Sequence, residues 1–465
     1  MPIDHGKLLA VTETTIPGLL LIDLPVPDDN RGWFKENWQR EKLLAHGLPD
    51  LGPVQNNISF NDTVGTTRGI HAEPWDKYVS VATGRIFGAW VDLRQGPTFG
   101  AVFTAELDPS RAMLVPRGVG NSYQTLEPDT AYTYLVNDHW SPDATYTYLN
   151  LADETVAIEW PIPLDDVEIS AKDLSHPPLG AVTPMPPKKV LVLGGNGQLG
   201  RALRIEFPNA EFTDRVDFDL TDPAVWESRR WQDYATVINA AAYTRVDVAE
   251  TAEGRRAAWM VNVSALTHLA QAALAHGLQV IHISSDYVFD GSYVVHDEIE
   301  PFSPLGVYGQ TKAAGDAIVA GIPRHYILRT SWVVGEGGNF VSTMASLARR
   351  GVDPKVVEDQ IGRLTFASEI ARAVRHLLHV SAPYGTYNIS NDGHPTNWAS
   401  IAREVFAATG QDPARVQGVT SEAYYSGVPA SAPRPRNSTL DLRKIKETGF
   451  VPVHQDDALR DYLRE

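Results

Sequence analysis

Tyr308 and Lys312 have the residue types and the spacing of a proton-transfer site. In the helix that we expect here, residues four apart lie on one face, so the two side chains would be neighbours. A lysine ammonium beside a tyrosine favours the phenolate and lets the tyrosine give or take a proton near neutral pH. Ser285 ends a strand-like run that begins at Gln279, and ligands of doubly wound sheets bind at such strand ends. An accidental pair on an exposed helix is the alternative, and Ser285 argues against it.

Three glycines, Gly194, Gly197 and Gly200, stand between an apolar strand-like run and a helix-like run. Glycine lets the backbone turn tightly and approach a pyrophosphate, which binds at the positive N-terminus of a helix. The triplet alone could be an ordinary turn, but its position between strand and helix predicts a dinucleotide site. Asp214, which follows Gly194 by 20 residues, could bind a ribose hydroxyl, whereas the adjacent Arg215 could bind a 2′-phosphate. The choice between NADH and NADPH therefore stays open.

A separate set of reactive side chains lies in the N-terminal part of the chain, where His71 and Lys77 share one short segment. A base and a cation suit the removal of a proton beside a carbonyl and the stabilisation of the resulting enolate. A metal site is the competing interpretation for a histidine in a small β-barrel, and a purely structural His71 is another. Because no second histidine is close to His71 in the sequence, we expect proton abstraction and no metal.

The elements that must position these residues differ between the two halves of the chain. The first half has short runs of β type, such as Tyr78–Ala82 and Tyr132–Val136, between Gly, Pro and Asp turns, and one expected helix near residues 35–46. This pattern is typical of an antiparallel sandwich or barrel. The second half alternates strand-like and helix-like runs, which predicts a parallel sheet with helices on both faces. Its last part is less regular and is expected to form a small substrate lobe.

The proline-rich residues 179–187 separate these two patterns. Prolines stiffen a segment and remove backbone donors, so we expect a semi-rigid linker here. The expected organisation is therefore an N-terminal domain of residues 1–178, the linker, and a C-terminal domain of residues 188–465. A chain of 465 residues suits several domains, because single cores rarely grow beyond about 250–300 residues.

Composition excludes several classes of function. The net charge of −17 argues against binding along nucleic acid, which depends on basic groups. The absence of cysteine excludes disulfides, thiolate nucleophiles and cysteine-zinc sites. No run approaches the roughly 20 apolar residues that span a membrane, and the start of the chain lacks the basic leader of a secretory signal. We therefore expect a cytoplasmic protein without nucleic-acid or membrane partners.

The C-terminal half resembles the dTDP-4-dehydrorhamnose reductase family of the extended short-chain dehydrogenase/reductase superfamily. The motifs that carry the resemblance are Gly194–Gly200, Asn239–Glu250, Ser285–Gly291, Tyr308–Lys312, Arg329–Trp332 and Arg434–Asn437. The resemblance implies a Rossmann fold in which Tyr308 protonates the C4 oxygen of the sugar while the nicotinamide delivers a hydride. Lys312 would hold the nicotinamide ribose, and Ser285 would donate a hydrogen bond to the carbonyl.

Further residues of this half are expected to bind ligands. The expected cofactor-binding residues are Gly194, Asn196, Gly197, Gln198, Leu199, Gly200, Asp214, Arg215, Asp219, Ala240, Ala241, Ala242, Tyr308 and Lys312. Trp332 is either a wall of the sugar pocket or a core residue. Arg434 and Arg436 are candidates for binding the substrate diphosphate, with solvated charges in a proline-rich loop as the alternative. A requirement for Mg²⁺ stays open.

The N-terminal half resembles the dTDP-4-dehydrorhamnose 3,5-epimerase family, whose members are cupin-like jelly rolls that work without a metal. The motifs are Arg31–Glu36, Gln55–Asn57, Arg68–His71, Leu114–Gly118, Tyr132–Tyr134, Trp140–Pro142, Ile158–Pro161 and Ile169–Asp173. The resemblance implies that His71 is the base, that Asp173 orients it, and that Tyr134 is the acid on the opposite face. It assigns substrate binding to Arg31, Glu36, Gln55, Asn57, Arg68 and Trp140.

The chain departs from this epimerase pattern near the expected site. Asn121 stands where the family usually has a histidine, and His139–Trp140 replaces a pair that is commonly Tyr-Tyr. The expected Asn-His-Ser reads Asn57-Ile58-Ser59. These departures leave open whether the domain inverts one carbon or two.

Together the two resemblances predict conversion of dTDP-4-dehydro-6-deoxy-D-glucose to dTDP-L-rhamnose by 3,5-epimerisation and NAD(P)H-dependent reduction of the C4 ketone. One alternative is a reductase whose N-terminal domain epimerises C5 alone or is an inactive scaffold. Another is a non-catalytic, nucleotide-binding regulatory subunit, against which the intact set of Tyr308, Lys312 and Ser285 argues. Because epimerases of this family usually dimerise, we expect a homodimer through the N-terminal domain.

Overall fold

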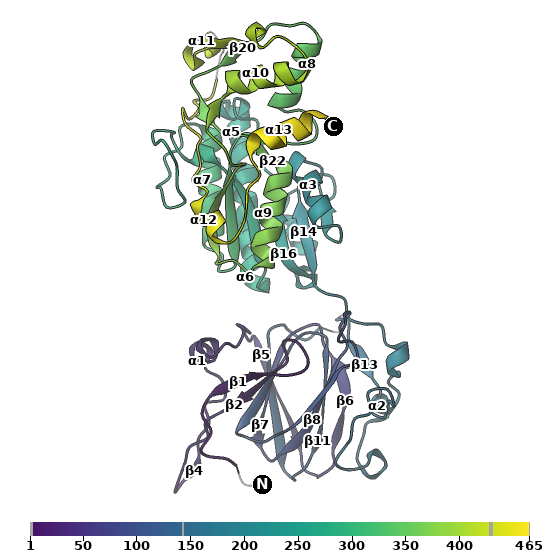
Figure 1. Ribbon diagram of the computed structural model, residues 1–465. Coiled ribbons are helices and arrows are strands. Elements are labelled where there is room, and N and C mark those ends of the chain that lie inside the picture. Colours follow the sequence, from purple (N-terminus) through teal and green to yellow (C-terminus); the bar gives the residue numbers. More distant parts are fainter. Residues whose placement is uncertain (1–2, 142–143, 427–430, 465) are drawn as a thin grey trace. The chain divides into compact units, whose positions relative to one another are not determined.

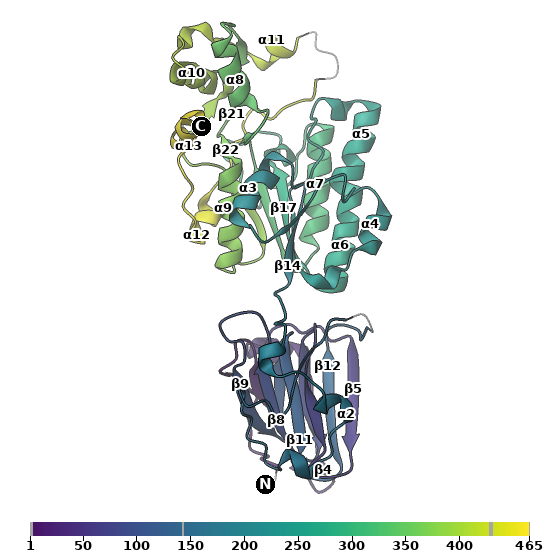
Figure 2. The ribbon, with the colours of Figure 1, turned by 90° about the vertical axis from the view of Figure 1, so that its right-hand side faces the viewer.

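The computed structural model describes residues 3–141, 144–426 and 431–464, so Pro142 of the Trp140–Pro142 motif lies outside the described residues. The chain divides into two compact units, Met1–Pro187 and Lys188–Glu465, which Figures 1 and 2 draw in purple to blue and in teal to yellow. In the described residues, no helix combines the length and the apolar character that crossing a membrane would require.

The N-terminal unit consists of two antiparallel sheets (Figure 1). The strand order of one sheet is β1 (Ala10–Glu13), β2 (Leu20–Asp23), β10 (Arg111–Val115), β7 (Lys77–Thr83), β12 (Thr130–Val136) and β5 (Gln55–Asn61). The order of the other is β13 (Thr147–Leu149), β6 (Thr67–Ala72), β11 (Val119–Thr125), β8 (Ile86–Asp92) and β9 (Val102–Leu107). The described residues of this unit also contain a short hairpin, β3 (Asp28–Asp29) and β4 (Gly32–Trp33), the helices α1 (Arg40–Ala45) and α2 (Ala171–Leu174), and two single 3-10 turns at Leu164–Asp166 and Leu179–Ala181.

The core of this unit lies between the sheets. Val79 and Met113 of the first sheet pack in one cluster with Trp90 and Tyr123 of the second. Along β5, by contrast, every second side chain is exposed, as expected for a sheet with one face toward solvent. The all-β, cupin-like domain predicted from the sequence is thereby confirmed, and the expected helix near residues 35–46 is found as the shorter α1.

Residues 179–187 differ from the expected linker, because they pack onto the N-terminal unit. Leu179 and Met185 are buried in one cluster with Ile70 and Val91. The N–H of Met185 donates to the carbonyl oxygen of Leu93 at 2.8 Å. Apolar side chains gain free energy on burial, and prolines suit a segment that offers few backbone donors. The boundary between the units therefore follows Pro187.

The C-terminal unit is built on a parallel sheet whose strands are buried on both faces. Its order is β15 (Glu211–Thr213), β14 (Lys189–Leu193), β16 (Tyr234–Asn239), β17 (Gln279–Ser285), β18 (His325–Thr330) and β23 (Gly385–Ile389). Successive side chains of a strand point to opposite faces, so Val192 packs in one core cluster and Leu191 and Leu193 in another. This explains the continuous apolar run of β14.

Helices cover both faces of this sheet (Figure 2). One face carries α3 (Gln198–Glu206) and α9 (Ala367–His379), whose Leu203 and Val374 belong to the cluster of Val192. The other face carries α6 (Ala265–His276) and α7 (Val307–Ala320), and α4 (Pro223–Ser228) and α5 (Ala252–Trp259) lie on the same side.

A smaller lobe with its own core completes the C-terminal unit, as the irregular final part of the sequence predicts. Val341 of α8 (Phe340–Arg349), Val405 of α10 (Trp398–Ala408) and Leu459 of α13 (Gln455–Arg464) share one cluster. The remaining elements are β19 (Val333–Val334), β20 (Lys355–Val357), β21 (Ile361–Gly362), β22 (Thr365–Phe366), β24 (Thr396–Asn397), β25 (Gln417–Val419), α11 (Ser421–Tyr425) and α12 (Arg443–Glu447).

Candidate active sites

A cleft of about 710 Å³ opens at the carboxyl ends of the parallel strands in the C-terminal unit. Its volume lies within the roughly 300–1,000 Å³ of typical ligand pockets. The predicted residues that line it are Gly194, Asn196, Gly197, Gln198, Leu199, Asp214, Arg215, Asp219, Ala240, Ala241, Ala242, Ser285, Tyr308, Lys312 and Trp332. They come from the segments that follow β14, β15, β16 and β18, from the last residue of β17 and from α7, so the sheet brings together residues that are far apart in the sequence.

The glycines of this cleft are required by close backbone contacts. Gly194 has φ +83°, and a Cβ atom there would lie 2.8 Å from the backbone nitrogen of Ala241. A Cβ atom at Gly200 would overlap the carbonyl oxygen of Gly194, so α3 could not approach the loop so closely with any other residue. Gly200 does not line the cleft and acts through this packing. The loop and the first turn of α3 thus form an open backbone cradle of the kind that binds phosphate.

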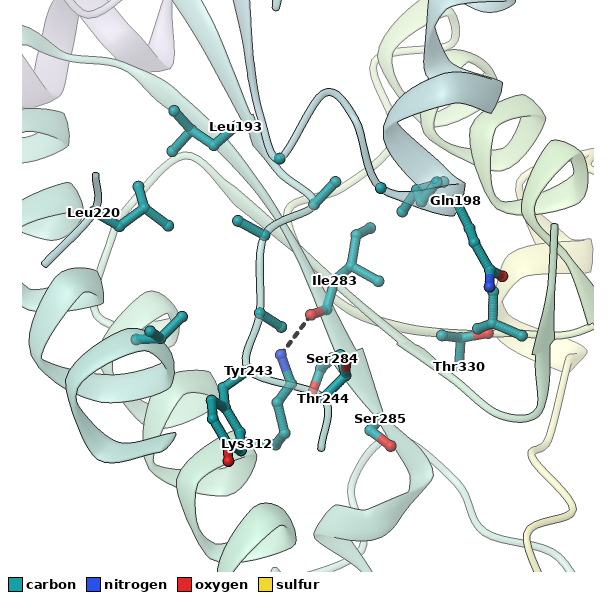
Figure 3. A pocket seen from close by; sticks show the side chains of 18 of the residues that line it. Leu193, Gln198, Leu220, Tyr243, Thr244, Ile283, Ser284, Ser285, Lys312 and Thr330 are labelled. Carbon is teal, nitrogen blue, oxygen red and sulfur yellow. Dashed lines mark hydrogen bonds between the residues drawn. The ribbon is translucent and has the colours of Figure 1, made fainter. Parts of the chain in front are cut away.

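Tyr308 and Lys312 lie one turn apart on α7 and are both buried. The amine of Lys312 donates to the carbonyl oxygen of Ile283 at 2.7 Å, beside Ser284 and Ser285 (Figure 3). Burial raises the pKa of Tyr308 to about 12 and lowers the pKa of Lys312 to about 8. This differs from the expectation that Lys312 favours the phenolate, because burial dominates the pKa of Tyr308. Tyr308 therefore holds its proton at neutral pH, as an acid must.

The sequence reasoning missed a buried network of polar and charged side chains behind Lys312. His282 Nε2 lies 3.4 Å from the amine of Lys312, and Asn239 donates to His282 Nδ1 at 3.0 Å. Asp316 accepts from Nε of Arg329 at 3.0 Å. Asp316 could have been found in the sequence, because it follows Lys312 by one further helical turn on the same face.

The N-terminus of α7 is held by a residue of another predicted motif. Glu250, the last residue of the Asn239–Glu250 motif, accepts a hydrogen bond from the backbone N–H of Val307 at 2.8 Å. A carboxylate at this end of a helix also interacts favourably with the helix dipole. The motif therefore positions the helix that carries Tyr308.

Trp332 lines the cleft and also packs within the unit. Its ring stacks on Trp398 with the ring centroids 3.8 Å apart. Arg434 and Arg436, by contrast, do not line the cleft. Arg434 pairs with Asp247 at 2.8 Å and lies over the ring of Tyr425. The structure thus places the two arginines in a nearby loop without bringing them to the cleft wall.

The predicted base of the N-terminal unit has its predicted partner. His71 on β6 and Asp173 on α2 form a contact of 2.8 Å between Nε2 and Oδ1, although they are 102 residues apart. The backbone N–H of Gly69 donates to the other oxygen of Asp173 at 3.2 Å. A Cβ atom at Gly69 would overlap this carboxylate and lie 2.9 Å from His71 Nε2. Glycine in the Arg68–His71 motif therefore makes room for the pair.

The protonation states of this pair suit a base. Burial lowers the pKa of His71, and the contact with Asp173 only partly opposes this effect. Burial opposes ionisation of Asp173, but hydrogen bonds from His71 and from Ser170 outweigh it and lower the Asp173 pKa. At neutral pH an uncharged imidazole therefore faces an ionised carboxylate.

Lys77 lies close enough to His71 for its charge to act on it, and Tyr134 lies beside Lys77. The buried amine of Lys77 pairs with Glu73 at 2.6 Å and lies 5.4 Å from the centre of the Tyr134 ring. Burial and then the charge of Glu73 raise the pKa of Tyr134, so it holds its proton. The charges of Lys77 and Glu73 both act on His71. Glu73 was not predicted, although its position two residues after His71 was a signal.

The residues expected to bind substrate fall into two groups. Asn57 pairs in register with Tyr134, and Gln55 donates to Asn57 at 2.9 Å. Arg68 donates to the hydroxyl of Ser59 at 3.0 Å, and the backbone N–H of the exposed Trp140 donates to Gln55 at 3.4 Å. This first group lies on β5 and β6 or contacts them; β6 also carries His71, and β5 pairs with β12, which carries Tyr134.

Arg31 and Glu36 form the second group and are not brought to His71 in this chain. Arg31 pairs with Asp29, and Glu36 pairs with Lys42. In Figure 1, β4 lies at the opposite edge of the N-terminal unit from β6 and α2. The sequence could not show this separation, because it depends on the path of the β3–β4 hairpin.

Asn121, which stands where the resemblance leads one to expect a histidine, is the cross-strand neighbour of His71. Its side-chain oxygen accepts hydrogen bonds from Trp90 at 2.9 Å and from the hydroxyl of Tyr132 at 3.2 Å. The amide is therefore held by the core of the sandwich.

His176 is a further residue that sequence reasoning missed. It lies beside the pair, with Nε2 3.7 Å from Oδ1 of Asp173. The expectation of no metal depended on the absence of a second histidine close in sequence, yet the fold supplies one. The potential ligand atoms of His71, Asp173 and His176 all lie within 4.8 Å of one another.

Two family models match the chain and divide it as the structure does. Residues 188–465 match the model described as RmlD substrate binding domain, and residues 13–181 match the model described as dTDP-4-dehydrorhamnose 3,5-epimerase. A parallel-sheet unit with a buried Tyr–Lys pair is thus joined to a β-sandwich unit with a His–Asp pair, which defines a fusion of two sugar-nucleotide enzyme domains. The chain belongs to the RmlD reductase family and carries a dTDP-4-dehydrorhamnose 3,5-epimerase domain at its N-terminal end.

Known relatives agree with this assignment. The chain is 51% identical over 180 residues to a protein named as an RmlC homolog from Streptococcus pyogenes, a match that covers 37% of this chain and 90% of the relative. It is 38% identical over 285 residues to the dTDP-4-dehydrorhamnose reductase of Streptomyces griseus, a match that covers 58% of this chain and 91% of the relative. The crystal structure of the Bacillus anthracis dTDP-4-dehydrorhamnose reductase in complex with NADP matches with a TM-score of 0.55 and 29% identity, covering 60% of this chain and 99% of that one.

Proposed function

We propose that the chain converts dTDP-4-dehydro-6-deoxy-D-glucose to dTDP-L-rhamnose, by 3,5-epimerisation in the N-terminal unit and reduction of the C4 ketone in the C-terminal unit. The observation that carries the proposal is the presence of an acid–base site in each unit, with protonation states that suit its step. Both steps use the C4 carbonyl, first as an electron sink and then as a hydride acceptor. The biosynthetic chemistry of both families supports a cytoplasmic location.

In the reductase step, the parallel sheet acts as a Rossmann-type, doubly wound dinucleotide fold. The backbone cradle between Gly194 and Gly200, which a side chain would fill, fits a pyrophosphate. When bound, a reduced nicotinamide supplies the hydride that adds to C4. Tyr308 donates its proton to the C4 oxygen, Ser285 donates a hydrogen bond to that oxygen, and Lys312 holds the ribose. The net change is C=O to CH–OH.

The cofactor choice is supported by the segment after β15. Asp214 accepts a hydrogen bond from Asn196, which holds it at the cleft. The side chain of Arg215 is 88% exposed and lines the same cleft, where it pairs with Asp219 at 3.5 Å. Exposed ion pairs contribute little free energy, so a 2′-phosphate could take the place of Asp219 as its partner. Together with the relative that was solved in complex with NADP, this favours NADPH, while NADH is the alternative.

In the epimerase step, His71 removes a proton from the carbon beside the C4 carbonyl, and Asp173 stabilises the imidazolium that forms. Lys77 stabilises the enolate oxygen, and Tyr134 returns a proton to the opposite face. Proton removal and return balance, so the step uses no cofactor, and none of these roles needs a metal. A second candidate is an epimerase of C5 alone. It is favoured by Asn121, which stands where the family usually has a histidine. The amide of Asn121 is held by Trp90 and Tyr132, so it does not take over the role of that histidine.

We also propose that the N-terminal unit forms a homodimer. Ile58 and Phe60 are exposed on β5, which lies at the end of its sheet, and Phe34 is exposed after the β3–β4 hairpin. Arg31 and Glu36 lie away from His71 of their own chain, so a second copy would supply them to the site.

Two assays on the full chain test the proposal. Incubation of the substrate in D₂O without cofactor should exchange the hydrogens at C3 and C5, which proton NMR detects. Addition of NADPH should then be followed by its oxidation in proportion to the sugar. Absence of exchange at both carbons would remove the epimerase claim, and absence of NADPH oxidation with any dTDP-4-ketosugar would favour the regulatory alternative.

A further inference from the structure

His176 is a buried histidine with unsatisfied ring nitrogens. Its side chain is 5% exposed and stacks on Tyr148, with the ring centroids 4.7 Å apart. By distance and angle, neither ring nitrogen makes a hydrogen bond within the described residues, although the backbone of Leu149 and the carboxylate of Asp173 both act on the ring. Burying a polar group without a strong partner costs free energy, so a ligand for Nε2 of His176 would stabilise the site.

The Nε2 atom of His176 faces the carboxylate that contacts the base. Oδ1 of Asp173 lies 3.7 Å from His176 Nε2 and 2.8 Å from His71 Nε2. A tetrahedral Zn²⁺ with ligands at about 2.0–2.2 Å holds neighbouring ligand atoms about 3.4 Å apart. The three atoms can therefore coordinate one ion after small side-chain shifts. The side chain of His71 is 34% exposed, which leaves a fourth position open to water.

We propose that His71, Asp173 and His176 form a binding site for a divalent transition-metal ion such as Zn²⁺, and that the bound ion blocks His71 as a base. The ion would replace the proton between His71 and Asp173. Metal binding itself does not depend on the proposed epimerase function, whereas the proposed inhibition rests on that function.

The surroundings of the three ligands suit such an ion. Two imidazoles and one carboxylate favour Zn²⁺, Ni²⁺ or Cu²⁺ over Mg²⁺, which prefers oxygen ligands. Burial lowers the pKa of both His71 and His176, so both are uncharged and can bind a metal at neutral pH. The nearby cation Lys77 is paired with Glu73 at 2.6 Å, which limits its repulsion of the ion.

Direct binding to the chelator-treated full chain tests the site. Zn²⁺ is titrated by calorimetry, and Co²⁺ is followed by the visible absorption of a tetrahedral complex. We expect the wild type to bind one ion per chain tightly, and we expect His176→Gln to have a Kd at least tenfold higher. His46→Gln, at an exposed histidine of the same unit, is the matched control and should bind as the wild type does. Equal Kd values for His176→Gln and the wild type, or no binding by the wild type, would overturn the proposal.

Deuterium exchange from D₂O into the substrate tests the inhibition. Zn²⁺ at saturation should abolish exchange by the wild type, and EDTA should restore it. Metal-free His176→Gln should exchange normally and should keep this activity at the same Zn²⁺ concentration. If the metal-free wild type shows no exchange, the epimerase proposal fails while the binding result stands. If Zn²⁺ binds and exchange continues, the inhibitory part of the inference is wrong.

Discussion

Burial shifts the pKa values of Tyr308 and His71 in opposite directions. It raises the pKa of Tyr308 to about 12, so the proposed acid keeps its proton at neutral pH. It lowers the pKa of His71, so the imidazole of the proposed base is uncharged at neutral pH. Burial disfavours the charged form of any group, and the tyrosine and the histidine carry their charge in opposite protonation states. One physical effect thus prepares both an acid and a base.

Loss of the Tyr308 hydroxyl should affect only the reductase. We expect Tyr308→Phe to slow NADPH oxidation by roughly 10²–10⁴-fold, the usual contribution of an acid–base group. Deuterium exchange at C3 and C5 should stay at the wild-type rate, because the epimerase residues lie in the other unit. NADPH oxidation within threefold of the wild type would contradict the assigned role.

The epimerase should follow the protonation of His71. Because the folded-state pKa lies below the ordinary 6.5, the uncharged base is already dominant at pH 6.5, and exchange should fall only at lower pH. In Asp173→Asn the carboxylate that favours imidazolium is gone, so the pKa should fall further and the rate should also drop. Exchange rates measured from pH 5 to pH 8 check both statements, and a midpoint above 6.5 in the wild type would contradict them.

At the scale of elements, α7 and its contacts position the reductase residues. Tyr308, Lys312 and Asp316 follow one another by one turn each, and Glu250 holds the start of the helix. Gly309 lets the helix approach the Tyr287 segment, because a Cβ atom there would overlap the carbonyl oxygen of Tyr287. The position of Tyr308 therefore depends on a glycine next to it.

Gly309→Ala should displace the first turn of α7. Overpacking of this kind costs about 1–3 kcal/mol, so we expect a lower Tm and at least a tenfold loss of NADPH oxidation. Gly338→Ala is the matched control, because no atom lies within 4 Å of its added Cβ. Kinetics and thermal unfolding of both variants check this, and a Gly309→Ala enzyme with wild-type rate would contradict it.

The elements also show what one sequence can and cannot reveal. The glycine loop and the Tyr308–Lys312 pair could be predicted, because their signals lie within single local segments. The packing of Leu179 and Met185 could not, because it depends on a surface formed by Ile70 and Val91. His176 escaped prediction for the same reason: it meets His71 only through the folded sandwich.

At the scale of the whole molecule, each unit has its own hydrophobic cores. The clusters that contain Trp90 and Ile70 lie within the first 187 residues, and those that contain Val192, Leu191 and Val341 lie within the rest. Residues 1–187 and residues 188–465 should therefore fold separately, with deuterium exchange in the first fragment and NADPH oxidation in the second.

The exact end of the first fragment should matter. A fragment of residues 1–178 lacks Leu179 and Met185, and burial of such side chains contributes about 1.5–3 kcal/mol each. We therefore expect it to unfold at a clearly lower temperature than the fragment of residues 1–187. Equal Tm values in a calorimetric comparison would restore the linker interpretation.

The central claim is that one chain inverts two carbons and then reduces a third position of the same sugar. It is tested most directly by incubating the full chain with dTDP-4-dehydro-6-deoxy-D-glucose and unlabelled NADPH in D₂O. The product should be dTDP-L-rhamnose with deuterium at C3 and C5 and a cofactor-derived hydrogen at C4, all visible in one proton NMR spectrum. A product labelled at C5 alone would identify a single-carbon epimerase. A reduced sugar without deuterium at C3 and C5, or no reduced sugar, would contradict the account.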